Sequence, residues 1–353
     1  MWYLDTDQEI SIEEDLQSPS TNLFRKTADI DLPAKLADGS RRGVCLFGTV
    51  PPRSIMTMDK VQQYAEKLAG TIKKLRPDGV IVYEIQEEEG RDGNERPFAF
   101  STTHPPRLFA KMLNELAHVE SIVYRTVAYH AKDNFDQWLN ETWDEYNAKA
   151  LVLVGGSTSN MQYPGYNVTE AAEVLRDHPY NFVAGGIVLP ERHRDKQDEH
   201  ERLFQKTESG ISFFTSQVVY NVDVAIWLLR DYDELCKERG VKPARLIFTF
   251  APFGRADTCT FLKWLGVEIP LGTEKRVLSR KTREAAINES VDICKENLKR
   301  ILYAIEFYHI SVPIGITVET VSKYSDEFNG SLKLFKVLQQ EMASFFSRKL
   351  RSS

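Results

Sequence analysis

The feature of this chain that most constrains its fold is the alternation of short β-branched runs with longer helical patterns. The alternation recurs eight times, and each strand-length apolar run is followed by a segment with apolar residues every three to four positions. Eight such units favour a (β/α)8 TIM barrel of the α/β class over a doubly wound sheet, which would usually show a glycine-rich first turn. The expected strands cover residues 43–50, 79–85, 121–128, 150–156, 181–190, 213–220, 244–253 and 312–319.

Two segments lie outside this repeat. Residues 1–40 are polar, acidic and rich in turn-forming residues, so we expect an N-terminal extension that wraps around the body or stays mobile. Residues 279–309 form one long helical pattern, which we interpret as a helix inserted before the eighth strand. The remaining chain, residues 41–353, is expected to be a single barrel domain that carries the catalytic site.

Composition narrows the class of partner. The formal net charge of −6 gives no overall basic field, so nucleic acid is not an expected partner. No apolar run approaches the length of a membrane span, and the N-terminus lacks the sections of a signal peptide, so we expect a cytoplasmic protein that does not bind membranes. The cysteines have no C-x-x-C spacing and are expected to be reduced and structural. They are Cys45, Cys236, Cys259 and Cys294.

Function is expected at the carboxyl ends of the strands, because the active sites of TIM barrels lie there. The segment FGTVPPRS, residues 47–54, is such a strand end, and its two prolines stop the strand. His130 and His193 are the only histidines at expected strand ends, and no paired carboxylates lie beside them. The sequence therefore predicts no metal site.

Three segments in barrel order carry a resemblance to a known family. The strand ending in PPRS (residues 51–54), the PERH segment (residues 190–193) and the block from Glu199 to Asp223 resemble methylenetetrahydrofolate reductase. The resemblance spans roughly residues 42–330. It implies a flavin-dependent oxidoreductase that passes a hydride from NAD(P)H through FAD to a reduced folate or a related pterin.

The resemblance also implies site residues. Gln217 matches the family's pterin-binding glutamine, whose amide can donate and accept at the pterin edge, and it is expected to serve both binding and catalysis. The alternative is a glutamine that only caps a strand. The other expected substrate contacts are Thr49, Tyr220 and Glu319. The expected flavin contacts are Arg125, Ser157, His193, Glu199 and Lys206. For Lys206 the alternative is a solvated lysine on an amphipathic helix.

Departures from the family pattern affect proton transfer. Gly48 stands where the family has its catalytic glutamate, and glycine cannot transfer a proton. We expect Glu84 at the end of the second strand to reach across and replace it, because a partly desolvated carboxyl can acquire the raised pKa of a general acid. The alternative is a structural carboxylate bonded to Arg125 or to a backbone amide of the next loop.

Gly155 and Ser157 replace an arginine and an aspartate of the family beside the flavin, so two alternatives to the flavoenzyme stay open. One is a barrel enzyme of one-carbon transfer or lyase type without flavin. The other is a non-catalytic folate-binding or regulatory relative. Long eukaryotic members of the family add a regulatory domain after the barrel, and we expect none in a chain that ends at Ser353. Assembly as a homo-oligomer is compatible with the sequence.

Overall fold

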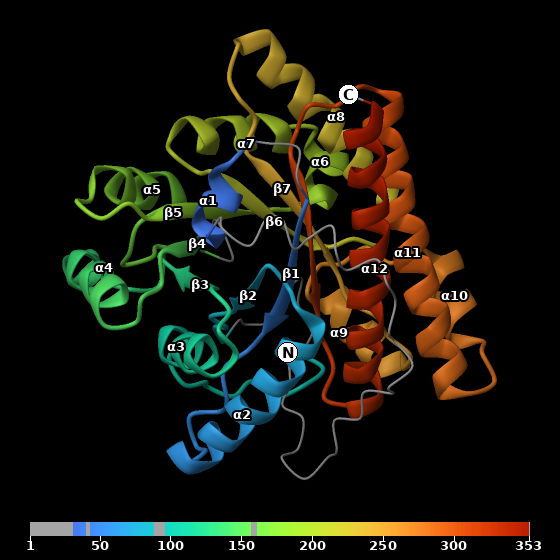
Figure 1. Ribbon diagram of the computed structural model, residues 1–353, viewed down its shortest axis with the longest axis horizontal. Helices are drawn as coiled ribbons and strands as arrows, with labels where there is room; N and C mark the ends of the chain where they lie inside the picture. The colour runs from blue at the N-terminus through green and yellow to red at the C-terminus, as the bar shows by residue number, and fades with distance from the viewer. Residues whose placement is uncertain (1–30, 40–42, 88–95, 157–160, 353) are drawn as a thin grey trace.

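Eight parallel strands close into a barrel in chain order (Figure 1). The computed structural model describes residues 31–39, 43–87, 96–156 and 161–352. Every strand lies within one of the expected runs, so the predicted TIM barrel is confirmed. The strands are β1 (Val44–Thr49), β2 (Gly79–Val82), β3 (Ser121–Thr126), β4 (Ala150–Val154), β5 (Val183–Val188), β6 (Phe213–Val218), β7 (Arg245–Phe250) and β8 (Ile314–Glu319).

Helices surround the barrel (Figure 1). They form because their apolar residues share one face, as in the first long helix, which buries Val61, Ala65, Leu68 and Ile72 at helical spacing. The longer helices are α2 (Met58–Leu75), α3 (Pro106–Ala117), α4 (Phe135–Asp144), α5 (Val168–Asp177), α7 (Glu199–Glu208), α8 (Val222–Arg239), α11 (Arg283–Phe307) and α12 (Ser325–Ser352). The shorter ones are α1 (Leu32–Ala37), η4 (Lys132–Asn134), α6 (Pro190–Lys196), α9 (Ala256–Trp264) and α10 (Leu271–Leu278).

The long helix expected before the eighth strand is α11. It packs against α8 and α12 in the outer ring, so the additional segments of this connection are α9 and α10 (Figure 1). Within the described ranges, no helix combines the length and apolarity needed to span a membrane.

Side chains alternate between the inside and the outside of the barrel along each strand. Val44 and Leu46 of β1 belong to the small apolar cluster inside the barrel, whereas Cys45 and Phe47 belong to the larger cluster between strands and helices. This period of two is the geometry of every strand. The same alternation continues to the strand ends, where it determines which side chains face the barrel axis.

The helix α1 closes the end of the barrel where the strands begin. Its Leu32 and Leu36 are buried in the interior cluster. Gly79, the first residue of β2, allows this close approach, because a Cβ there would lie 2.3 Å from a methyl carbon of Leu32. The buried Arg245 donates hydrogen bonds to the carbonyls of Asp38 (2.7 Å) and Lys35 (3.1 Å), which attaches the end of α1 to β7. The part of the extension nearest the barrel is therefore packed against it.

Candidate functional site at the barrel mouth

Polar side chains replace apolar ones inside the barrel near the carboxyl ends of the strands. The Tyr124 and Thr215 hydroxyls lie 2.7 Å apart across the interior, and the Tyr83 and Tyr124 rings pack edge to face with centroids 4.6 Å apart. Glu319 ends β8 beside them and is also buried. Among the described residues, aromatic hydroxyls and the Glu319 carboxyl therefore line the mouth of the barrel, and such groups can both pack against and hydrogen-bond a flat polar ring.

Glu319 lies directly beside Gly48, since the two residues pair in the β1–β8 register. A Cβ at position 48 would lie 2.8 Å from the Tyr83 ring and 3.2 Å from the Glu319 Cβ, so a larger residue would require the Tyr83 side chain to shift and would crowd Glu319. Burial raises the pKa of the Glu319 carboxyl, and the hydrogen bond from Tyr83 offsets only part of that rise. The site beside Gly48 therefore holds an acid with a raised pKa, supplied by β8.

Glu84 does not reach toward Gly48. Its carboxylate turns to the end of β3, where it accepts hydrogen bonds from the Thr126 amide (2.5 Å) and hydroxyl (2.6 Å) and lies 3.1 Å from the His130 Nε2 atom. Burial raises its pKa, but His130, Arg125 and Thr126 together outweigh burial, and the net pKa is lowered. The expected rise in the pKa of Glu84 is therefore wrong, and its contacts are those of the structural alternative.

Arg125 is engaged in the same cluster. Its guanidinium lies 3.4 Å from the Glu84 carboxylate and 4.5 Å from the centre of the Trp138 ring on α4. Burial lowers its pKa, and Glu84 opposes that effect. The positive charge of this expected flavin contact is thus already paired within the protein.

Two expected flavin contacts lie together on α7, facing the barrel wall. The Lys206 ammonium donates to the Ile187 carbonyl (3.1 Å), and burial lowers its pKa. Glu199 is fully buried, and its carboxylate accepts from the Leu189 amide and from Arg192, each at 3.1 Å. These contacts fasten α7 to the end of β5 and to α6. The alternative of a solvated Lys206 disagrees with the structure, because the half-buried side chain is hydrogen-bonded to the Ile187 carbonyl.

The other expected flavin contacts do not lie together in the structure. His193 lies on α6, is buried, and its Nε2 atom is 3.0 Å from the Asp231 carboxylate on α8. Ser157 lies outside the described residues. His193 is therefore close to Glu199 and Lys206 on the outer side of β5, while Arg125 belongs to the β3 cluster.

Gln217 lies where the register between β6 and β7 is irregular. Its side-chain amide donates to the Leu265 carbonyl (2.9 Å), and its oxygen accepts from the Val218 amide (3.0 Å). A glutamine amide has two hydrogens and two lone pairs, so these contacts use half of its capacity. The half-buried side chain keeps one donor and one acceptor for a ligand.

Tyr220 and Thr49, two expected substrate contacts, face the helical layer. The Tyr220 hydroxyl is buried and donates to the Ala251 carbonyl (2.7 Å), with the Ser290 hydroxyl 2.8 Å away. The Thr49 side chain is hydrogen-bonded to Tyr64 on α2. Of the expected substrate residues, Glu319 is the one placed inside the barrel mouth beside Gly48.

The PPRS segment that follows β1 pairs with the loop after β2. Arg53 forms an isolated antiparallel bridge with Thr103. Residues 96–104 of this loop extend to α9, where Phe98 packs edge to face on Phe261 with ring centroids 5.2 Å apart. The two prolines thus end β1 at a point where the chain can anchor a loop beside the mouth.

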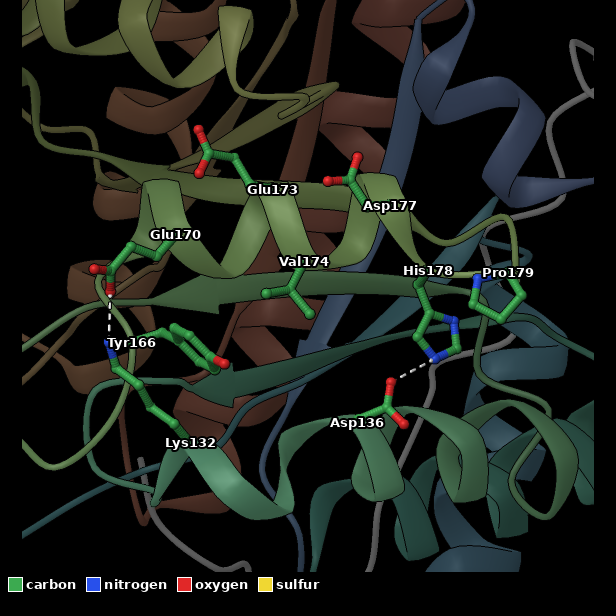
Figure 2. Close-up of a pocket in the computed structure, with 9 residues that line it drawn as sticks. All are labelled: Lys132, Asp136, Tyr166, Glu170, Glu173, Val174, Asp177, His178 and Pro179. Carbon is green, nitrogen blue, oxygen red and sulfur yellow. Dashed lines mark hydrogen bonds and ion pairs between the residues drawn. The ribbon is translucent and has the colours of Figure 1, made fainter.

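A surface cavity of about 490 Å³ lies between α4 and α5 (Figure 2). Ion pairs mark its two ends, Lys132 with Glu170 at 3.1 Å and His178 with Asp136 at 3.5 Å. Its lining carries four carboxylates and one lysine, a balance that opposes an anionic ligand. The lining residues are Lys132, Asp136, Tyr166, Glu170, Glu173, Val174, Asp177, His178 and Pro179.

Glu191, at the start of α6, gives a prediction for stability. Burial raises its pKa to about 7, and its Oε2 atom has no hydrogen-bond partner among the described residues. A carboxyl with a raised pKa destabilises the folded state progressively from pH ~4.5 up to pH ~7, because the unfolded chain ionises first. A one-unit change in pKa corresponds to about 1.4 kcal/mol. We expect Glu191→Gln to stabilise the protein by about 2 kcal/mol at pH 8, after allowance for partial solvent screening.

Urea unfolding at pH 4 and pH 8 measures this effect, and Glu201→Gln on the exposed face of α7 is the matched control. The prediction is contradicted if the free energy of unfolding changes between pH 4 and pH 8 by the same amount in wild type and in Glu191→Gln.

Comparison with known proteins places this geometry in context. No protein-family model and no curated protein matches the chain. An uncharacterized protein from Clostridium thermocellum, which binds two copies of 5-methyl-5,6,7,8-tetrahydrofolic acid, is 27% identical, with a TM-score of 0.73. The alignment covers 87% of this chain and 98% of that one. Oxaloacetate acetylhydrolase (11% identity, TM-score 0.42) and dihydropteroate synthase from Xanthomonas albilineans (13%, TM-score 0.39) are more distant. The chain is a TIM-barrel protein similar over most of its length to a methyltetrahydrofolate-binding protein.

Proposed function

We propose that this protein binds a reduced folate of the 5-methyltetrahydrofolate type at the carboxyl-terminal mouth of its barrel. The observation that carries the proposal is the likeness, at 27% identity over 98% of the other chain, to a protein that binds this ligand. The mouth is the place in such barrels where ligands bind. The polar, aromatic lining of the mouth has the chemistry that a pterin ring requires.

Glu319 and Tyr83 supply the central contacts of the proposed site. A pterin presents ring N–H groups, an amino group and a carbonyl along one edge, so it needs both donors and acceptors. The Glu319 carboxyl accepts when ionised and can also donate when protonated, and burial raises its pKa. The Tyr83 and Tyr124 rings offer faces and edges for packing.

The exposed Lys323 follows β8 beside the mouth, where its ammonium lies 5.0 Å from the centre of the Phe98 ring. We assign it as a candidate contact for the anionic tail of the folate, because a flexible ammonium at a rim can pair a carboxylate.

A flavin-dependent reductase is the narrower form of the proposal. It would need FAD, with NAD(P)H as electron donor. Its expected cofactor residues Lys206, Glu199 and Arg125 already bond within the protein, so a flavin would have to displace these contacts. Folate binding without flavin, either for one-carbon chemistry or as a non-catalytic relative, agrees better with the contacts at the mouth.

Titration of the purified full-length chain with 5-methyltetrahydrofolate tests the proposal. We expect a saturable calorimetric signal and a higher Tm, since a ligand at 100 times its Kd stabilises the folded state by about 2.7 kcal/mol. Added FAD is expected to change neither the Tm nor its own spectrum. Absence of both heat and Tm shift with the folate would overturn the proposal. A flavin absorbance band on the purified protein would support the narrower reductase.

Gln217→Ala is expected to weaken folate binding by about 30-fold. The variant removes the one donor and one acceptor that the amide keeps for a pterin edge, and each unmade hydrogen bond costs about 1 kcal/mol. Calorimetry measures the effect, and Gln205→Ala on the exposed face of α7 is the matched control. Unchanged affinity in a folded Gln217→Ala variant would remove this residue from the proposed site.

A further inference from the structure

Three helices on the outer side of the barrel bring two histidines and an aspartate together. His193 lies on α6, His200 is the second residue of α7, and Asp231 lies on α8. One nitrogen or oxygen atom from each side chain lies within 4.8 Å of the other two. A helix boundary separates His193 from His200, and Asp231 is distant from both in the sequence. The packing of α6 and α7 on α8 therefore creates the cluster.

We propose that His193, His200 and Asp231 form a binding site for a divalent transition metal of the zinc type. Two imidazoles and one carboxylate are a donor set that Zn²⁺ and its neighbours in the first transition row accept. Three protein ligands leave a fourth position for water. The site lies outside the barrel, and it joins the three helices α6, α7 and α8.

The geometry is close to what a metal needs. The His193 Nε2 and Asp231 Oδ2 atoms lie 3.0 Å apart, near the separation of about 3.3 Å between tetrahedral ligands around zinc. The His193 and His200 rings have centroids 5.1 Å apart and are nearly perpendicular, at 82°. His200 is half-buried near the start of α7, and one of its ring nitrogens lies within 4.8 Å of the ligand atoms of His193 and Asp231.

Unsatisfied nitrogen atoms provide an independent observation. The Nδ1 atoms of His200 and His193 are buried, and neither has a hydrogen-bond partner among the described residues. The His193 Nδ1 atom lies on the other edge of the ring from the Nε2 atom beside Asp231, so the His200 atom is the one that bears on the site. His193 itself is fully buried. Buried polar atoms without partners are uncommon in folded proteins and are explained by bound ions or by water.

The surrounding charges permit a cation. Metals bind the neutral form of an imidazole. On α6, Arg192 is bonded to Glu199, and Arg194 is bonded to Asp195 and Glu268. The Asp231 carboxylate would thus neutralise part of the charge of a bound divalent ion directly, and the Glu199 carboxylate lies in its vicinity.

Metal titration of the full-length chain tests the site. The chain is first treated with a chelator, the chelator is removed, and the chain is then titrated with Zn²⁺ or Co²⁺. We expect about one bound Zn²⁺ per chain by elemental analysis and a Co²⁺ spectrum with tetrahedral bands. Zn²⁺ should raise the Tm, because the ion binds only the folded arrangement. His200→Ala should weaken metal binding at least tenfold and abolish the zinc-dependent rise in Tm.

His118→Asn, which changes an exposed histidine at the end of α3, is the matched control and should bind as wild type does. His200 is half-buried and so suits this test better than the fully buried His193. The proposal is overturned if wild type binds no more metal than His200→Ala, or if both variants lose metal equally. Folate binding does not enter the assay, so its outcome is independent of the function proposed above.

Discussion

Glu319→Ala is expected to lower the affinity for 5-methyltetrahydrofolate by about 100-fold. The carboxyl lies beside Gly48 at the end of β8 and is hydrogen-bonded to Tyr83. Its removal would leave the Tyr83 hydroxyl and the pterin edge without a partner, and hydrogen bonds to charged groups contribute about 1.5 to 3 kcal/mol each. Glu319→Gln keeps an acceptor and should lose about tenfold. Calorimetry on variants with a cooperative thermal transition measures both.

The pH dependence of binding separates this role from a merely structural one. The carboxyl has a raised pKa, so its protonation changes at a pH above the ordinary glutamate range. Wild-type affinity should therefore vary with pH above ~4.5, and Glu319→Gln should lose that part of the variation. Glu306→Ala on the exposed face of α11 is the control. Wild-type affinity in a folded Glu319→Ala variant would place the folate elsewhere.

The strands of this barrel could be predicted from the sequence because their signal is local. Each apolar run has strand length and is followed by a helical pattern, and the barrel then follows from the count of eight. The alternation of inward and outward side chains along each strand also indicates which residues reach the site. Ile81 faces the interior and Val80 and Val82 face the helices, so Tyr83 had to face inward and Glu84 outward.

The parity of β8 similarly places Glu319 inside. Thr317 and Glu319 alternate with Ile316 and Val318, which lie in the outer apolar cluster. The hypothesis that Glu84 replaces the lost acid considered the distance between strands but not the direction of the side chain. The register that sets Glu319 beside Gly48 depends on how the first and last strands close the barrel, which is not a local property of either segment.

For the expected flavin contacts, the sequence does not distinguish a ligand contact from an internal one, and the reason is different. Glu199, Leu203 and Lys206 recur at helical spacing on α7, and the structure buries this face against the barrel. A charged residue on such a face can bond a cofactor or the protein's own backbone, and spacing alone does not distinguish the two. Asp231 was likewise missed, because its link to His193 crosses two helices and leaves no pattern in the sequence.

Glu84→Ala is expected to destabilise the protein by about 3 to 5 kcal/mol, the range for breaking a buried ion pair. The variant would leave Arg125, whose side chain is 12% exposed, without its carboxylate, and the Thr126 amide without its acceptor. Glu84→Gln keeps an oxygen for that amide and should cost less. Because the pKa of Glu84 is lowered, its stabilising contribution is present above the ordinary glutamate pKa and is lost as the pH falls.

Urea unfolding at pH 7 and at pH 3 measures this loss, and the difference between wild type and Glu84→Ala should shrink in acid. Glu87→Ala, three residues further along the same segment and exposed, is the matched control and should stay within about 0.5 kcal/mol of wild type. Folate affinity should be nearly unchanged in folded Glu84→Gln, because the carboxylate faces β3 rather than Gly48. A Glu84→Gln variant as stable as wild type that no longer binds folate would return Glu84 to the ligand site.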